Sequence, residues 1–275
     1  MAAKRLRDIG EGRGLRQTLR PTLDEMIHRM READPREIVQ GRTGFGELLK
    51  FGYHGNLGTT EHDVWSNQGV FVPPTAARIH AIVSDDSNDS ASGTGAQSIK
   101  VWGIVDGVAD SETVATDATD GTTPVNTTKS YTNIFRMRVI ASGSNETNVG
   151  NITATAAAPD STVTAHIAAD EGNTLQAIYL VPTAQTLMLD SWYIGLQKGG
   201  GNAGGVNARL RVKPSGESWT TRDKLGADTD ATSHFVREYA YPKEYAGGTW
   251  LKVSAVGSTT AMEVFAGFDG VLRAT

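Results

Sequence analysis

ARIHAIVSDDSNDSASGTGAQSIKVWGIVDG (residues 77–107) and GTTPVNTTKSYTNIFRMRVIASG (residues 121–143) are the stretches that decide the fold. In both, short segments with an apolar residue at every second position alternate with clusters of Gly, Ser, Asn and Asp. Period-two apolarity is typical of half-buried strands, and these clusters turn a chain but do not continue a strand. The stretch therefore predicts an antiparallel β domain.

The alternation is cleanest at Phe135-Arg136-Met137-Arg138-Val139. Three apolar side chains are expected on one face of this strand and two arginines on the other. A sheet that packs on one face leaves the other to solvent or to a partner. Arg136 and Arg138 are therefore candidate contact residues.

The same pattern continues to residue 275 and predicts a mainly β protein with two antiparallel β lobes behind an N-terminal arm that contains a helix. The number and spacing of strands in the second lobe favour a sandwich or jelly roll, because each sheet must cover one apolar face. The predicted domains are an arm at 1–52, a β domain at 53–172 and a β-sandwich domain at 173–275. The predicted strands are 77–84, 97–105, 112–116, 128–141, 151–156 and 162–168, then 175–181, 186–197, 206–213, 218–222, 233–241, 249–256 and 261–272.

The head and the body of the chain differ in charge. Residues 1–50 hold 11 Lys/Arg and 8 Asp/Glu, net +3, and the remaining residues hold 15 and 23, net −8. Thr22 and Glu25 have the spacing of a capping box, which predicts a helix that ends before Pro35. A further helical turn is expected over 45–51.

A basic arm on an acidic body predicts docking on an acidic protein surface or on a neighbouring copy. Nucleic acid is a disfavoured partner, because Asp8 and Glu11 interrupt the basic cluster and no aromatic residues interleave it. The helix would present one narrow apolar stripe, which needs a surface to lie on. The candidate partner-binding residues of the arm are Arg5, Arg7, Arg13, Arg16, Arg20, Leu23, Ile27 and Met30.

No catalytic, cofactor or metal site is predicted. The chain has no cysteine and no G-x-S-x-G pattern, and its histidines lack the helical spacing of zinc proteases. A G-x-G-x-x-G match at residues 199–204 precedes a strand pattern, not the helix that a pyrophosphate site needs. Oxygen-bearing side chains at Asp85–Ser90 resemble the start of a calcium loop, but the same residues are usual in exposed turns, so calcium is a minor hypothesis. Neither a signal peptide nor a membrane span is expected, and no membrane partner.

Five motifs carry a resemblance to a family. They are GTGAQSIKVWG (93–103), GTTPV (121–125), the strand Tyr131–Val139 with IFRMRV, NVGNI (148–152) and LQAIYLVP (175–182). In this order they resemble segments of virion structural proteins of tailed bacteriophages, over roughly residues 58–275.

The resemblance implies a capsid or tail component with no catalytic residues to carry over. The expected function is that of a head decoration (cement) protein in the virion, assembled in the host cytoplasm. It would bind the lattice of the major capsid protein, associate with itself as a homotrimer, and clamp neighbours with residues 1–50.

Two alternatives stay open. The first is a tail or fibre component that binds host surface glycan on an aromatic platform. Its candidate residues are Trp192, Trp219, Tyr239, Tyr241 and Tyr245. The second is a glycan-degrading enzyme, which is disfavoured because no acid/base pair can be named.

Overall fold

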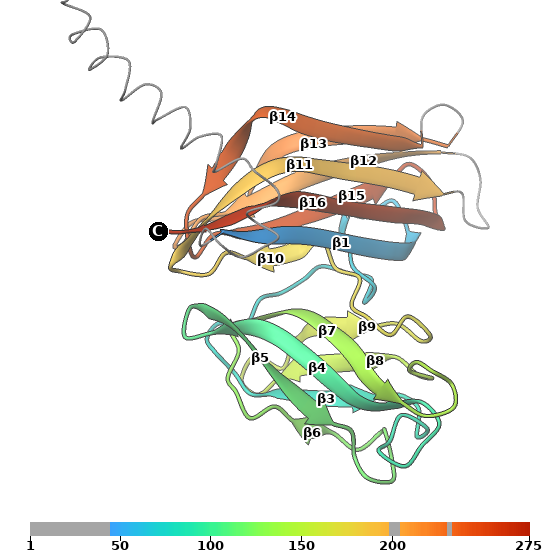
Figure 1. The fold of residues 1–275 in the computed structure, drawn as a ribbon. Helices are drawn as coiled ribbons and strands as arrows, with labels where there is room; N and C mark the ends of the chain where they lie inside the picture. The colour runs from blue at the N-terminus through green and yellow to red at the C-terminus, as the bar shows by residue number, and fades with distance from the viewer. Residues whose placement is uncertain (1–44, 198–203, 230–232) are drawn as a thin grey trace, which may run out of the picture. The chain divides into compact units, whose positions relative to one another are not determined.

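A computed structural model describes residues 45–197, 204–229 and 233–275, and residues 48–275 form one compact unit. All regular elements in these ranges are strands (Figure 1). No described segment forms a helix with the length and apolarity that a bilayer crossing requires. The strands are β1 (Phe45–Leu57), β2 (His62–Asp63), β3 (His80–Ser84), β4 (Ala96–Val105), β5 (Val108–Ala115), β6 (Val125–Asn126), β7 (Asn133–Ser142), β8 (Ile152–Ala156), β9 (Val163–Ile167), β10 (Ile178–Leu180), β11 (Gln185–Gln197), β12 (Gly205–Lys213), β13 (Thr220–Asp228), β14 (His234–Tyr245), β15 (Trp250–Gly257) and β16 (Met262–Ala274).

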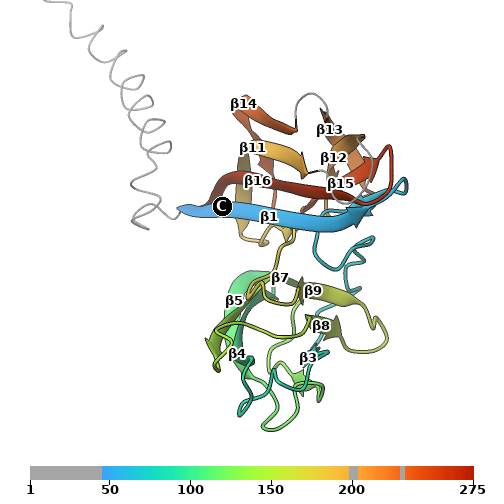
Figure 2. The same cartoon turned by 90° about the vertical axis from the view of Figure 1, so that its right-hand side faces the viewer.

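The strands form four small sheets. The first has the order β1-β16-β11-β14 (Figure 2). The second has the order β10-β15-β12-β13, with β2 beside β15. If β1 and β10 to β16 are numbered one to eight in chain order, the two sheets read 1-8-3-6 and 2-7-4-5. The third and fourth sheets, β6-β3-β8-β9 and β5-β4-β7, use only strands that lie between β2 and β10 in the chain.

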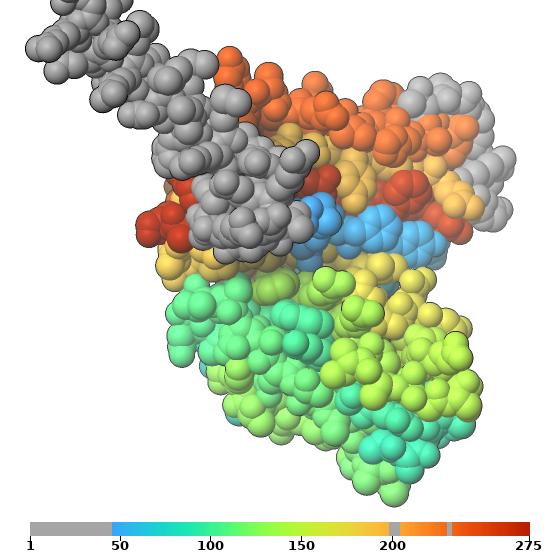
Figure 3. All heavy atoms as spheres, viewed as in Figure 1, coloured from blue at the N-terminus to red at the C-terminus, as the bar shows by residue number. Residues whose placement is uncertain are grey.

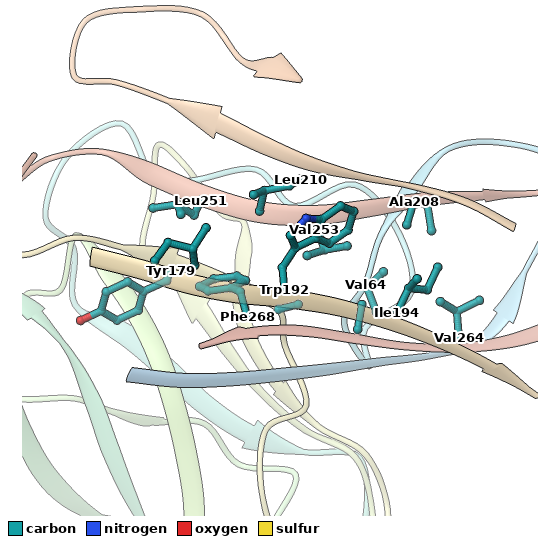
Figure 4. Close-up of a cluster of buried hydrophobic side chains, with 14 of the residues drawn as sticks. Val64, Tyr179, Trp192, Ile194, Ala208, Leu210, Leu251, Val253, Val264 and Phe268 are labelled. Carbon is teal, nitrogen blue, oxygen red and sulfur yellow. The ribbon is translucent and has the colours of Figure 1, made fainter. Parts of the chain in front are cut away.

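The largest core lies between the first and second sheets. Trp192 and Ile194 of β11 and Phe268 of β16 meet Leu210 of β12 and Val253 of β15 (Figure 4). All five side chains are fully buried, so each contributes on the order of 2 kcal/mol from the removal of apolar surface from water.

A second core lies between the third and fourth sheets. Ile82 and Ile152 come from the third sheet, and Ile99 and Met137 come from the fourth. In β4 and β7 these residues alternate with half-buried or exposed ones, as the period-two pattern of the sequence predicts.

The prediction of a mainly β protein is confirmed, and every strand predicted from residue 77 onward overlaps a strand of the structure. The predicted helix that begins after Thr22 and the arm residues Arg5, Arg7, Arg13, Arg16, Arg20, Leu23, Ile27 and Met30 lie outside the described residues, so these predictions stay predictions.

The helical turn predicted over 45–51 is wrong, because these residues belong to β1. Leu48, Lys50 and His54 point to the buried side of this strand, and Leu49 and Phe51 are exposed. A Cβ on Gly52 would lie 2.2 Å from the carbonyl oxygen of Val64, so this strand passes another part of the chain at backbone distance. Such close approach needs glycine and an extended backbone.

Candidate functional site

The outer face of β4 and β7 carries a group of cations around one indole ring. Trp102 lies opposite Arg136, and Lys100 lies opposite Arg138, in the antiparallel register of the two strands. Lys100 Nζ is 5.0 Å and Arg136 Cζ is 5.6 Å from the centroid of the Trp102 ring, which is within the range of cation–π attraction. Among the described residues, neither arginine nor Lys100 forms an ion pair. We call these four residues the basic face; they leave positive charge available to an acidic partner.

A buried amine lies near the basic face. Lys50 of β1 donates a hydrogen bond from Nζ to the carbonyl oxygen of Phe135 at 2.6 Å. Burial, and then the charge of Arg136, lower the pKa of the Lys50 amine to about 7. The amine therefore changes its charge near neutral pH, unlike an exposed lysine.

The Asp85–Ser90 segment is the minor candidate for calcium binding. In the structure this segment is organised around Asp89. This fully buried carboxylate accepts hydrogen bonds from the backbone N–H groups of Ala96 (2.7 Å), Val149 (2.8 Å) and Gly150 (2.9 Å) and from Ser84 Oγ (2.6 Å). Both of its oxygens thus face donors, which is the arrangement of a structural anchor and not of a cation ligand. We call these five residues the Asp89 cluster.

Three of the five resemblance motifs meet at this cluster. A Cβ on Gly95 of the first motif would lie 2.1 Å from Asp89 Oδ1, and a Cβ on Gly121 of the second would lie 2.4 Å from the carbonyl oxygen of Asp86. Gly150 of the fourth motif donates to Asp89, and a Cβ there would lie 2.3 Å from Asp85 Oδ1. These glycines allow two loops to approach the carboxylates of Asp85 and Asp89 and a third to approach the backbone of Asp86 and Asp89, so the motifs describe one packed junction.

β14 is an exposed edge strand. It pairs only with β11 in the described sheets, and most of its side chains face solvent (Figure 3). Tyr241 is 82% exposed, and Phe235 and Val236 are 38% and 47% exposed. Leu189 pairs with Lys243, but two residues later the partner is Glu238, so residues 239–242 bulge out of the strand. An edge strand with exposed apolar side chains is a template for association.

The predicted aromatic platform is wrong as a single surface. Trp192 is fully buried in the first core and donates from Nε1 to Asp223 Oδ2 at 3.2 Å. Tyr239 donates to the same oxygen at 3.2 Å, and its pKa is raised by burial and by Asp223. Tyr241 is exposed, whereas Trp219, Tyr239 and Tyr245 are half-buried and pack against two different buried clusters.

A hollow of about 260 Å³ lies beside β2, β12 and β15. Its lining combines acids, bases and aromatic rings. Lys252 donates to Asp63 Oδ2 at 2.7 Å, and its Nζ lies 4.6 Å from the centroid of the Trp219 ring. Glu61 accepts from Arg211 Nε at 2.8 Å. The residues that line it are Glu61, His62, Asp63, Val70, Arg211, Trp219 and Lys252.

The three histidines of the predicted strands all lie on strands of the structure. His80 is buried in β3, His166 is buried in β9, and His234 is exposed on β14. Ser66 Oγ lies 2.8 Å from His166 Nδ1 and also donates to the carbonyl oxygen of His166 at 3.1 Å. This pair fastens the segment that holds Ser66 to β9.

His54 and His62, which are eight residues apart, come together in the structure. His54 Nε2 lies 3.2 Å from His62 Nδ1. Burial, and then the charge of His62, lower the pKa of His54 to about 4. Among the described residues, no group of three or more His, Cys, Asp or Glu residues is arranged to hold a metal ion.

Of the candidate contact residues, Arg136 and Arg138 are the two that the structure describes, and both are exposed on β7 as expected. The sequence interpretation missed Lys100 and Trp102, although they alternate with buried Ile99 and Val101 in the same way. It also missed the hollow, because its lining residues come from segments about 150 positions apart. Comparison with known protein families and with curated protein sequences gave no match.

Proposed function

We propose that this chain is a non-enzymatic virion structural protein of a tailed bacteriophage, and specifically a head decoration protein that binds the lattice of the major capsid protein. The observation that carries the proposal is the strand order 1-8-3-6 and 2-7-4-5 of the first two sheets. This is the order of an eight-stranded jelly roll, an architecture that recurs in viral particles.

The same order supports our proposal that the first two sheets form a jelly roll. A propeller-like arrangement of four small sheets fits less well, because each propeller blade is built from its own short repeat of neighbouring strands. Here β1 neighbours β16, and the strands of the third and fourth sheets lie between the first and second strands of the jelly roll. The proposed body is thus a jelly roll with a second β lobe inserted after its first strand.

The resemblance supports the assignment to virion proteins. The motifs at 93–103, 121–125 and 148–152 are far apart in the chain, yet all three contribute to the Asp89 cluster and its surroundings. Their recurrence in a fixed order therefore has a structural reason, because the junction needs all of them. This makes chance agreement of short loops a weaker explanation.

The proposed partners fit the surfaces. The basic face around Trp102 and the basic residues of 1–50 would contact acidic patches of the capsid lattice. The exposed edge β14 would supply self-association, proposed as a homotrimer, because an edge strand with exposed apolar side chains needs a cover.

Binding to capsids tests the proposal. Deletion of residues 1–44 removes no residue of the sixteen described strands, and circular dichroism checks that the shortened chain is folded. We expect the full chain to bind stripped capsids in a saturable manner, and the deletion variant to bind at least about tenfold more weakly. A matched variant, Arg136→Glu with Arg138→Glu, separates the basic face from the arm. Equal binding by all three chains, or no binding by the full chain, would refute the proposal.

Self-association has its own test. We expect wild-type protein to run as a trimer in light scattering after size exclusion. Tyr241→Asp should yield monomers, and Val108→Asp, which charges another exposed apolar position, should leave the trimer intact. A monomeric wild type would remove this part of the proposal.

The second candidate is a tail or fibre component that binds host surface glycan. It is favoured by the position of Trp219 at the hollow beside β12 and β15. Copy number separates the two candidates, because a head protein occurs in hundreds of copies per virion and a tail protein in about a dozen.

A further inference from the structure

The hollow beside β2, β12 and β15 lies on the side of the second sheet that faces away from the largest core. Leu251, Val253 and Ala255 of β15 point into that core, and Lys252 and Ser254 between them point the opposite way. Arg211 of β12 pairs with Lys252 in register and lies on the same outer side. Adjacent strands of one sheet therefore supply fixed positions for part of the lining.

An ion pair with little exposure forms the floor of the hollow. The side chains of Lys252 and Asp63 are 7% and 2% exposed, and Nζ lies 2.7 Å from Oδ2. Burial raises the pKa of Asp63, while the charge of Lys252 opposes that rise. Asp63 Oδ2 also accepts a hydrogen bond from the N–H group of Phe71 at 2.6 Å, so the carboxylate fastens the segment that ends at Phe71 to β15 and holds Lys252 in place.

Glu61 also lines the hollow, and its carboxylate is held in one orientation by hydrogen bonds. Glu61 accepts hydrogen bonds from Arg211 Nε at 2.8 Å and Ser254 Oγ at 2.6 Å, and it is also bonded to Arg209. Burial raises the pKa of Glu61. The hydrogen bonds from Ser254 and Arg211, together with the charges of Arg211 and Arg209, outweigh this effect and lower the pKa below its ordinary value. Glu61 is therefore ionised at neutral pH, both of its oxygens are held by donors of the chain, and its side chain remains 29% exposed at the hollow.

The balance of charges indicates what the hollow would bind. Its lining holds two acids, Glu61 and Asp63, whose formal charges cancel those of Arg211 and Lys252, and one histidine, His62. Trp219, which is half-buried and has Lys252 Nζ over its ring, adds aromatic surface, and Val70, which is 61% exposed, adds an apolar rim. Charged donors and acceptors beside an aromatic ring match a neutral ligand with many hydroxyl groups, which hydrogen-bonds to both signs and packs its C–H face on the ring.

We propose that this hollow is a carbohydrate-binding site for a single neutral sugar unit, such as the exposed end of a surface polysaccharide. The volume is slightly below the usual range of pockets for drug-sized ligands, which suits one ring better than an extended chain. This proposal depends on the residues that line the hollow and not on the proposed position of the protein in the particle. Head and tail proteins could both use it.

The test is a binding titration by ligand-observed NMR with the methyl glycosides of glucose, galactose and mannose, at up to tens of millimolar. We expect at least one glycoside to bind with a dissociation constant in the millimolar range. Trp219→Ala should weaken it about tenfold or more. Phe51→Ala is the matched control, because it removes an aromatic ring that is 44% exposed on β1 and does not line the hollow, so glycoside binding should stay unchanged.

A second variant keeps the test valid if Trp219→Ala impairs folding. Val70→Arg places a long side chain at the exposed rim without removing a core contact, and it should abolish binding while the melting temperature stays unchanged. Three results would overturn the proposal: no binding of any of the three glycosides to the wild type, equal loss in Phe51→Ala, or tighter binding of glucuronate than of every neutral glycoside.

Discussion

Asp89→Asn is the substitution that tests the interpretation of the Asp89 cluster most sharply. The change keeps the shape of the side chain but replaces one acceptor oxygen with an NH2 donor. Asp89 is fully buried and accepts four hydrogen bonds, three of them from backbone N–H groups. After the change, at least one of those donors faces another donor.

The expected cost follows from these contacts. A hydrogen bond to a charged group contributes about 1.5–3 kcal/mol, and a buried donor that loses its partner costs about 1–3 kcal/mol. Asp89 Oδ2 has two of the four donors, Ser84 Oγ and the Gly150 amide, so loss of either acceptor position affects two bonds. The free energy of unfolding should therefore fall by about 3 kcal/mol, which for a domain of this size lowers the melting temperature by roughly 10 °C.

Urea denaturation followed by circular dichroism measures this cost. Asp86→Asn is the matched control, because Asp86 Oδ1 accepts two hydrogen bonds from exposed Asn88 within the same loop. The control should lose less than about 1 kcal/mol. Equal losses in the two variants would show that Asp89 does not hold the junction, and the structural explanation of the motifs would fail with it.

Two further predictions concern β1. The pKa of Lys50 is lowered in the folded chain to about 7, so unfolding takes up a proton between pH 7 and pH 10 and wild-type stability rises with pH across that window. Lys50→Met should remove this rise, which is on the order of 4 kcal/mol, and a pH-independent difference between the two proteins in urea titrations would contradict it. Gly52→Ala should destabilise by about 3 kcal/mol, because the new Cβ would lie 2.2 Å and 2.4 Å from two backbone atoms. Gly55→Ala, whose Cβ would meet only the Tyr53 side chain, should cost less than about 1 kcal/mol, and equal thermal shifts would refute the close approach.

The alternation of apolar residues was sufficient to predict most strands, and β1 shows where it fails. The inward positions of β1 include Lys50 and His54, which a pattern search counts as outward residues. The strand pairs with β16, more than 200 positions later, so no local signal marks it. Leu48 and Leu49 suggested a helical turn, but pairing with the distant strand β16 makes this segment a strand.

Trp192 shows a second limit. The register of β11 shifts between Leu189 and Ser191, where residues 239–242 bulge from the partner strand. The shift changes the phase of the alternation, so Leu189 and Trp192 both point into the core although they are three positions apart. A strict period of two places one of them outside, and only the pairing of both strands shows the shift.

The candidate surfaces were predictable only in part. The exposure of Arg136 and Arg138 could be predicted, because each lies between apolar neighbours on one strand. The role of Asp89 could not be predicted from the sequence, because two of its hydrogen-bond donors, Val149 and Gly150, lie about 60 residues later in the chain. The hollow could not be predicted either, because Glu61 and Arg211 are 150 positions apart in the chain and meet only in the folded protein.

An electron cryomicroscopy map of the virion tests the central claim most directly. The proposal predicts density for the eight-stranded body and its inserted lobe on the outer surface of the head, repeated over the capsid lattice, with residues 1–44 running across a subunit boundary. Absence of this density from the head lattice, in virions that contain the chain, would contradict it.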